Sequence, residues 1–253
     1  MSELKPRRVL IGIEYEGTCY AGWQRQQNGP SVQAELETAL SRAVHTKITV
    51  TGASRTDAGV HALGQRAHFD TDSTIPDDKW PFVFNTLLPE DIRVISALRV
   101  PDDFHARFWA LGKAYEYRIL NRPFPSALRR NFTAFVPLPL DPSLMKGALP
   151  DLIGRHDFSA FEAAGGTAKT TVRQITEAKL IQDGDEIVLT VQGDAFLYNM
   201  VRIIAGTLVS IGQKRLAPDA FRQAIQNRDR LLLGATAPAR GLTLLRVMYG
   251  DRL

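Results

Sequence analysis

The chain has 253 residues, of which 44% are hydrophobic and 23% charged, an ordinary globular composition with room for one large or two ordinary domains. Thirty-one Lys and Arg residues against 27 Asp and Glu residues give a formal net charge of +4. This mild basic excess is compatible with a polyanionic partner but does not establish one. The chain has no low-complexity tract and no charge block long enough to suggest a disordered tail.

The cysteine, histidine and apolar residues of the chain indicate a soluble protein without a metal site. Cys19 is the single cysteine, so an intrachain disulfide is excluded and a reducing compartment is expected. The five histidines show no metal-ligand spacing. The polar segment 1–8 lacks a signal-peptide pattern, and the apolar stretch 196–211 is interrupted and too short for a bilayer. We therefore expect a cytoplasmic protein with no membrane partner.

Strand and helix patterns alternate through the first hundred residues. Ser31 is a suitable cap for an amphipathic helix, and Pro76 stands where a second helix begins. The predicted elements are a strand at 9–15, a helix at 31–44, strands at 48–51 and 67–71, a helix at 76–88 and a strand at 92–98. The order of elements is therefore β-α-β-β-α-β.

The remainder of the chain repeats this order of elements if one extra helix is allowed. The turn-rich segment 101–103 predicts a boundary between a domain at 1–103 and a second at 104–253. Asp183-Gly184 predicts a hairpin. The predicted elements are a strand at 113–120, an irregular excursion at 121–140, a helix from 141, strands at 172–181 and 186–191, helices at 198–211 and 218–228, and a strand at 242–249. Each half can form an α+β ferredoxin-like (split βαβ) unit.

A loop at residues 54–62 carries the residues best suited to chemistry. Gly59 allows a tight turn, and Thr56 can bond its own backbone. Arg55 and Asp57 are two residues apart, so in an extended chain they project to the same face, where the guanidinium keeps the carboxylate ionised. An aspartate in such a loop could also simply cap the turn.

The run Arg-Thr-Asp-Ala-Gly-Val-His-Ala at 55–62 resembles the signature of the tRNA pseudouridine synthase A family. Shorter matches follow at Gly-Trp-Gln 22–24, Ala-Arg-Phe 106–108, Asn-Met-Val-Arg 199–202 and Arg-Gly-Leu 240–242. Ser54 departs from the family's usual glycine, and Lys113-Ala114 from its common pair of arginines. The resemblance covers essentially the whole chain.

The resemblance implies a fold and an activity. The two ferredoxin-like halves would join edge to edge in one extended, mostly antiparallel sheet with helices packed on it and a central active-site cleft. The protein would be a homodimer that isomerises uridine to pseudouridine at positions 38, 39 and 40 of the tRNA anticodon stem-loop. The reaction breaks the C1′–N1 bond and joins C5 to C1′, so it requires no cofactor and no metal.

The resemblance also implies roles for particular residues. Asp57 would be the catalytic nucleophile, Arg202 would pair with it, and Tyr115 would stack on the uracil and shuttle the C5 proton. The residues expected to bind substrate are Tyr115, Arg55, Leu242, Trp23, Gln24 and Arg107. Further phosphate contacts are expected from Arg25, Arg66, Arg118 and the Arg129-Arg130 pair. Asp57 can either add to C1′ or withdraw the 2′ proton to give a glycal, and the sequence leaves both open.

Other interpretations of the same residues remain open. Tyr20 and Trp23 could equally be packing anchors beneath their loop, and Tyr115 could belong to the core. A non-catalytic RNA-binding protein would need the aromatic residues but not Asp57. A glycoside hydrolase would need a second carboxylate, for which Asp70 and Asp72 are the nearest acids in sequence.

Overall fold

The structure is a computed structural model that describes residues 6–27 and 29–252. The chain divides into two compact units: unit 1 extends to Leu111 and resumes at Leu244, and unit 2 is Gly112–Thr243. This division differs from the predicted boundary after Asp103. The reason is the segment that follows Asp103, where Phe104 is fully buried against His68 and Tyr249 of unit 1.

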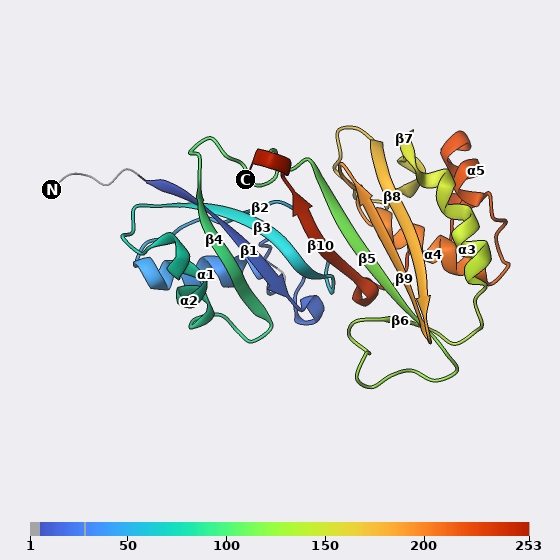
Figure 1. Ribbon diagram of the computed structural model, residues 1–253, viewed down its shortest axis with the longest axis horizontal. Coiled ribbons are helices and arrows are strands. Elements are labelled where there is room, and N and C mark those ends of the chain that lie inside the picture. Colours follow the sequence, from blue (N-terminus) through green and yellow to red (C-terminus); the bar gives the residue numbers. More distant parts are fainter. Residues whose placement is uncertain (1–5, 28, 253) are drawn as a thin grey trace. The chain divides into compact units, whose positions relative to one another are not determined.

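Unit 1 has the β-α-β-β-α-β order that the sequence predicts (Figure 1). Its central strand β1 (Arg7–Tyr15) lies between β3 (His61–Thr71) and β4 (Ile92–Val100), and the short β2 (Thr51–Gly52) pairs with β3. These pairings are all antiparallel. A central first strand flanked by the third and fourth strands is the split βαβ arrangement.

The helices of unit 1 are α1 (Val32–Val44) and α2 (Trp80–Asn85). Ser31 caps α1 by accepting the Ala34 N–H at 3.3 Å, as predicted. The predicted helix at 76–88 is a 3₁₀ turn, Asp77–Lys79, followed by the short α2. Trp80 of α2 packs edge-on against Phe69 of β3, with ring centroids 5.1 Å apart, so α2 covers the face of the sheet.

The C-terminal strand β10 (Leu242–Met248) belongs to unit 1 from Leu244 onward and is the neighbour of β3. Gly64 permits this close approach, because an added Cβ there would lie 3.0 Å from the Cα of Arg246. The Tyr249 hydroxyl then donates to the Ala106 carbonyl at 2.7 Å. Local sequence patterns had placed this strand in the second half.

Unit 2 is an antiparallel sheet in the order β5-β9-β8-β7, with β6 added in parallel to β5. Its strands are β5 (Gly112–Asn121), β6 (Ala134–Val136), β7 (Gly154–Asp157), β8 (Val172–Asp183) and β9 (Glu186–Gly193). The predicted hairpin between β8 and β9 is present, and Gly184 supplies the positive φ of 55° that its turn requires. The sequence did not predict β7.

The helices of unit 2 are α3 (Pro142–Ala148), α4 (Met200–Gly212) and α5 (Ala220–Asn227) (Figure 1). Asp141 caps α3 by accepting the N–H groups of Ser143 and Leu144. The central helix α4 is buried along most of its length. Within the described residues, no helix has the length and apolarity needed to cross a membrane. The α+β class predicted for the chain is confirmed.

Candidate active site

The loop between β2 and β3 is a turn fixed by its own backbone and by an adjacent segment. The Val60 N–H donates to the Asp57 carbonyl at 3.1 Å, and Gly59 has a φ of 76°. The Gly59 N–H donates to the Tyr20 carbonyl at 3.3 Å. Asp57 is partly exposed in the middle of this turn. The turn therefore presents a carboxylate on a backbone that is already ordered.

The first residue of the loop is held by a buried side-chain amide. Gln65 of β3 is fully buried, its Oε1 accepts the Ser54 N–H at 3.2 Å, and its Nε2 donates to the Ser54 carbonyl at 2.8 Å. Both backbone groups of Ser54 are thereby satisfied as they would be in a sheet. Ser54 itself is buried, so a residue with a side chain is accommodated where the family usually has glycine.

The residue before Asp57 is held from a different strand. The hydroxyls of Thr56 and Tyr15 share a hydrogen bond of 2.7 Å, and both residues are buried. The Thr56 hydroxyl thus bonds to β1, whereas the sequence predicted a bond to its own backbone. The Thr56 carbonyl accepts the Trp23 N–H at 3.0 Å. These contacts fix the chain on the N-terminal side of Asp57.

The Gly-Trp-Gln element, residues 22–24, packs against the backbone of the loop that carries Asp57. Gly22 has a φ of +103°, and an added Cβ would lie 2.6 Å from the Thr56 carbonyl oxygen and 3.1 Å from the Asp57 carbonyl carbon. Only glycine permits this approach. Trp23 is 1% exposed and contacts Gly52, whose added Cβ would lie 2.6 Å from the indole Cζ2. The structure therefore assigns Trp23 to packing, which corrects its expected contact with a base.

Tyr20 is also a packing residue. It is buried, and its hydroxyl donates to Asp91 Oδ1 at 2.6 Å. Burial and the bond to Asp91 raise the pKa of Tyr20. Gln24 is exposed, although its Nε2 donates to Gln33 Oε1 at 2.8 Å. The Tyr20 and Trp23 side chains are therefore buried, whereas the Gln24 side chain remains at the surface.

Arg55 and Arg107, both predicted to bind substrate, are exposed residues of unit 1. Arg107 follows Ala106, whose N–H donates to His68 Nδ1 at 3.2 Å and whose carbonyl accepts the Tyr249 hydroxyl. The backbone of the Ala-Arg-Phe element is thus anchored on both sides. As a result, Arg107 and Phe108, which is 75% exposed, project from a fixed support.

In unit 2, Tyr115 lies on β5 opposite Val191 of β9. Its ring contacts Phe196 edge-on at 5.1 Å between centroids, and the residue is 6% exposed. Tyr117, two residues along the strand, is fully buried, and its hydroxyl donates to the Pro238 carbonyl at 2.7 Å. Burial raises the pKa of Tyr117. Tyr117 therefore belongs to the core of unit 2, whereas a small part of the Tyr115 surface remains exposed.

Arg202 and Leu242 occupy defined positions in the same unit. Arg202 Nε donates to the Ala237 carbonyl at 2.8 Å, and Nη1 donates to Asn199 Oδ1 at 2.6 Å. These bonds fix the plane of the guanidinium group. Leu242 follows Gly241, where an added Cβ would lie 2.7 Å from the Tyr117 ring. Close packing of this glycine against β5 fixes the start of β10.

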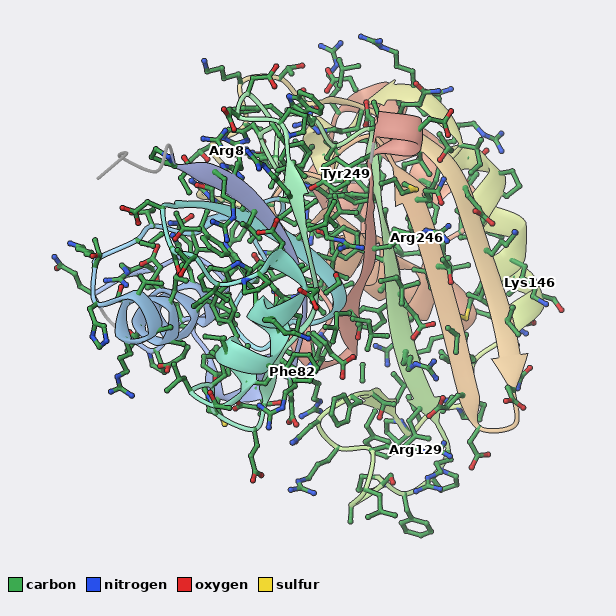
Figure 2. All side chains as sticks on the ribbon, turned by 60° about the vertical axis from the view of Figure 1, so that its left-hand side comes forward. Arg8, Phe82, Arg129, Lys146, Arg246 and Tyr249 are labelled. Carbon is green, nitrogen blue, oxygen red and sulfur yellow. The ribbon has the colours of Figure 1, made fainter. Side chains whose placement is uncertain are left out.

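Several arginines expected at RNA phosphates are engaged in ion pairs. Arg118 and Arg129 both donate to Glu186, at 3.0 and 2.9 Å respectively. Arg129 lies on the long excursion between β5 and β6 (Figure 2). In unit 1, Arg66 Nη1 donates to the Ser96 hydroxyl at 3.0 Å. These contacts hold the side chains in place and partly neutralise Arg118 and Arg129.

The structure also bears on the glycosidase interpretation. Asp70 accepts two hydrogen bonds of 2.7 Å from Arg8. The hydrogen bond and charge of Arg8 lower the pKa of Asp70, so this carboxyl stays ionised and is poorly suited to act as a general acid. Within the described residues, no cluster of three or more His, Cys, Asp or Glu side chains could hold a metal ion.

Sequence reasoning missed two side chains that support the loop, Tyr15 and Gln65. Neither carried a usable signal, because each is an ordinary strand residue whose partner lies in the loop, 41 positions away for Tyr15 and 11 for Gln65.

Comparisons with known proteins show which family the chain resembles. The sequence matches the family profile described as tRNA pseudouridine synthase over residues 11–109 and 148–250. It is 46% identical over 245 residues to tRNA pseudouridine synthase A 2 of Clostridium tetani, covering 96% of this chain and 99% of the relative. It is 47% identical over 243 residues to tRNA pseudouridine synthase A of Acetivibrio thermocellus, covering 96% and 100% of the two chains.

A third relative, tRNA pseudouridine synthase A of Halalkalibacterium halodurans, is 44% identical over 238 residues, covering 93% of this chain and 90% of the relative. The fold and these matches define the class of protein as an isomerase that acts on uridine in tRNA. Within that class, the chain belongs to the tRNA pseudouridine synthase family.

Proposed function

We propose that this protein converts uridine to pseudouridine at positions 38, 39 and 40 of the tRNA anticodon stem-loop, with Asp57 as the catalytic nucleophile. The observation that supports the proposal is the preorganised turn around Asp57. The flanking residues are held by Gln65, Tyr15 and Gly22, while Asp57 itself stays partly exposed. A nucleophile on a backbone that is already ordered spends little free energy on positioning during the reaction.

The proposed reaction conserves all atoms and electrons of the substrate. The Asp57 carboxylate adds to C1′ as the C1′–N1 bonding pair leaves with the uracil, or it removes the 2′ proton to give a glycal. The uracil turns and C5 bonds to C1′ as the bond between Asp57 and C1′ breaks or, on the glycal route, as the proton returns from Asp57 to C2′. C5 then loses its proton and N1 gains one, so Asp57 ends the reaction as the free carboxylate. Because nothing is oxidised or hydrolysed, this chain's side chains suffice and no cofactor is invoked.

The other site residues have proposed roles within the same reaction. Arg202 pairs with the Asp57 carboxylate and keeps it ionised, and its fixed guanidinium plane suits that task. Tyr115 stacks on the uracil and moves the C5 proton, and Leu242 packs against the ring and excludes water. In unit 1, Arg55 enters the space that the flipped base vacates.

Recognition of the RNA is proposed to use exposed side chains on anchored supports. Arg107 and Gln24 meet this description, since both are exposed and each lies on a segment with a fixed backbone. We also propose a cytoplasmic homodimer, which the family resemblance favours.

The proposal is tested by incubating the protein with an unmodified anticodon stem-loop tRNA transcript and mapping pseudouridine by position. We expect modification at positions 38 to 40 and none in transcripts that carry cytidine there. A protein that binds the transcript without forming pseudouridine at any position would instead support the non-catalytic RNA-binding interpretation.

A further inference from the structure

Helix α1 carries two buried polar side chains whose function the reaction does not explain. Gln33 and Glu37 are four residues apart, so they lie on the same side of the helix, and each is 8% exposed. Gln33 Nε2 donates to Glu37 Oε1 at 3.0 Å. Burial of an amide and a carboxylate is unfavourable unless their hydrogen bonds are satisfied, so their partners identify what the pair does.

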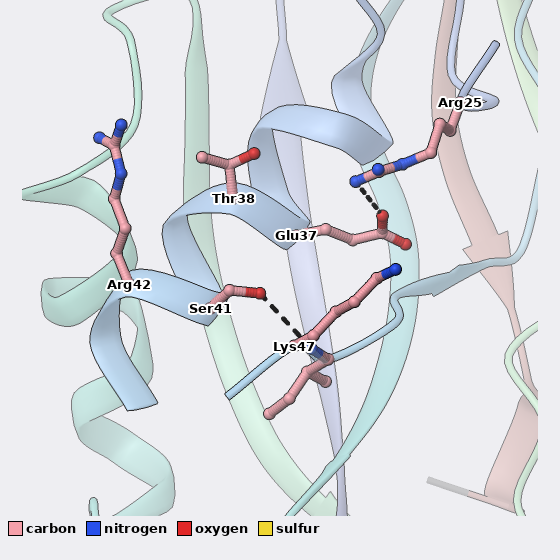
Figure 3. A pocket seen from close by; sticks show the side chains of 7 residues that line it. Arg25, Glu37, Thr38, Ser41, Arg42 and Lys47 are labelled. Atoms are coloured by element: carbon pink, nitrogen blue, oxygen red, sulfur yellow. Dashed lines mark hydrogen bonds and ion pairs between the residues drawn. The ribbon is translucent and has the colours of Figure 1, made fainter. Parts of the chain in front are cut away.

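One set of partners belongs to the Gly-Trp-Gln segment and the arginine that follows it. Gln33 Oε1 accepts the Arg25 N–H at 2.9 Å and the Gln24 Nε2 group at 2.8 Å. The Gln33 N–H donates to the Trp23 carbonyl at 3.0 Å. Glu37 Oε2 forms an ion pair of 2.5 Å with Arg25 Nη2 (Figure 3). The pair therefore binds the segment through both backbone and side-chain groups.

The other partner is Val50, on the segment that leads into the catalytic loop. Gln33 Nε2 donates to the Val50 carbonyl at 3.0 Å, and Glu37 Oε1 accepts the Val50 N–H at 3.1 Å. The two side chains thus supply the hydrogen bonds that the N–H and carbonyl of Val50 would otherwise form with a neighbouring strand. This replacement explains why the predicted strand at 48–51 is reduced to Thr51–Gly52.

Both segments bear directly on the loop that carries Asp57. Gly22 packs against the backbone of Thr56 and Asp57, and the Trp23 N–H donates to the Thr56 carbonyl. Val50 precedes Ala53, whose N–H donates to the Arg66 carbonyl at 2.7 Å, and Ser54, which Gln65 holds. Fixing these two segments relative to one another fixes both supports of the loop.

We infer that Gln33 and Glu37 are positioning residues for the Asp57 loop, with Arg25 as the counter-charge of Glu37. Nothing in this arrangement requires Arg25 to contact RNA. Its side chain is 50% exposed beside a hollow of about 360 Å³ next to α1, where Lys47 also extends towards Glu37 (Figure 3). The inference rests on the proposed function only for its effect on catalysis, because its effect on the loop can be measured in the free protein.

The test compares Glu37→Ala and Glu37→Gln with Leu40→Ala, a control on the same helix. Leu40 is 1% exposed and is not one of the residues that hold the Asp57 loop. Its truncation should therefore lower the free energy of unfolding without loosening that loop. Amide hydrogen exchange of the free proteins is measured at Trp23 and Gly59, which donate to Thr56 and Tyr20, with amides of the β1–β4 pairing as the reference.

In Glu37→Ala, the Trp23 and Gly59 amides should exchange about tenfold faster relative to the reference, because a charged hydrogen-bond acceptor is lost. Glu37→Gln keeps an acceptor for the Val50 N–H and should show a smaller change. Leu40→Ala should leave the ratio at the wild-type value. Equal ratios in Glu37→Ala and Leu40→Ala would overturn the inference.

Catalysis provides the second readout. At saturating tRNA, the single-turnover rate should fall about tenfold in Glu37→Ala and recover in part in Glu37→Gln, with a tRNA Kd close to the wild-type value. Arg25→Met should act in the same way as Glu37→Gln. A changed exchange ratio with a wild-type rate would overturn the positioning role, whereas a changed ratio in a protein that makes no pseudouridine at all would count against the proposed function alone.

Discussion

The hydroxyl of Tyr15 lies 2.7 Å from the hydroxyl of Thr56, in a hydrogen bond that joins the central strand of unit 1 to the residue preceding Asp57. Tyr15 is 3% exposed, and its ring also lies 6.1 Å from that of Trp23. A single buried side chain thus contacts both the loop that carries Asp57 and the Gly-Trp-Gln segment that packs against this loop. Rigid support of this kind is what a site on a loop needs, because loops are otherwise mobile.

Tyr15→Phe should therefore slow catalysis more than it destabilises the protein. The ring and its packing are retained, so loss of one hydrogen bond should lower the free energy of unfolding by about 1 kcal/mol. The single-turnover rate at saturating tRNA should fall several-fold, because the Thr56 side chain can then reorient. Urea denaturation and rapid-quench kinetics on the same preparations measure the two effects. A wild-type rate in the folded variant would show that this hydrogen bond does not support catalysis.

Gly22→Ala should damage the site through the backbone. The residue has a φ of +103°, and the new Cβ would lie 2.6 Å from the Thr56 carbonyl oxygen, so the loop must move. We expect a loss of about 1–3 kcal/mol in the free energy of unfolding and a rate reduced at least tenfold. Gly147→Ala on α3 is the matched control, because its added Cβ meets no atom within 4 Å. That variant should be as active as the wild type and slightly more stable. Equal rates for the two variants would contradict the bracing role of Gly22.

The elements that the sequence predicted well are those fixed by local patterns. Alternation predicted β1 and β5, capping residues predicted the starts of α1 and α3, and Asp183-Gly184 predicted the hairpin. The eight-residue signature around Asp57 identified the family, which the comparisons confirm. Each of these signals is contained in a short stretch of chain.

The features that the sequence did not predict depend on contacts between distant residues. The strand at 48–51 was overestimated because the side chains of Gln33 and Glu37 take the backbone groups of Val50. Trp23 was predicted to contact the substrate, but its side chain is buried. The local sequence does not show whether an aromatic side chain in a loop points to solvent or into the core. Arg129 was expected at RNA, but its partner Glu186 lies 57 positions along the chain. Local pattern carries no information about such pairings.

Stability of unit 1 should depend on pH through His68. Burial, followed by the positive charge of Arg8, lowers the pKa of His68 to about 4 from its usual value near 6.5. Between these two values the unfolded chain binds a proton that the folded chain does not, so the free energy of unfolding rises with pH across this window. The contribution is complete above about pH 6.5, lost as the pH falls to about 4, and at most about 3 kcal/mol.

His68→Asn should flatten this dependence while keeping an acceptor for the Ala106 N–H. Urea denaturation at pH 5 and pH 7.5 measures the difference for each protein. His105 and Asp70 also face His68 and are present in both proteins, so their effects cancel in the comparison. The same pH dependence in the variant and the wild type would remove His68 as its source.

Substitutions at Tyr115 separate stacking from proton transfer. Tyr115→Phe retains the ring and its edge-on contact with Phe196, so the tRNA Kd should stay close to the wild-type value. Loss of the hydroxyl should slow turnover by about 10²–10⁴ if it moves the C5 proton. Tyr115→Leu should lose both functions. Single-turnover rates, tRNA Kd values and melting midpoints of the two variants distinguish these roles. Full activity in Tyr115→Phe would remove the hydroxyl from the reaction.

The account depends most on Asp57, and one measurement tests it directly. Asp57→Asn keeps the size of the side chain and its place in the turn but removes the carboxylate that we propose as the nucleophile. Pseudouridine is quantified at positions 38, 39 and 40 of an unmodified tRNA transcript under single-turnover conditions, together with the tRNA Kd and the melting midpoint. We predict no detectable pseudouridine, a Kd within a few-fold of the wild-type value and a nearly unchanged midpoint. Pseudouridine formation at more than a trace of the wild-type rate would show that Asp57 is not the nucleophile.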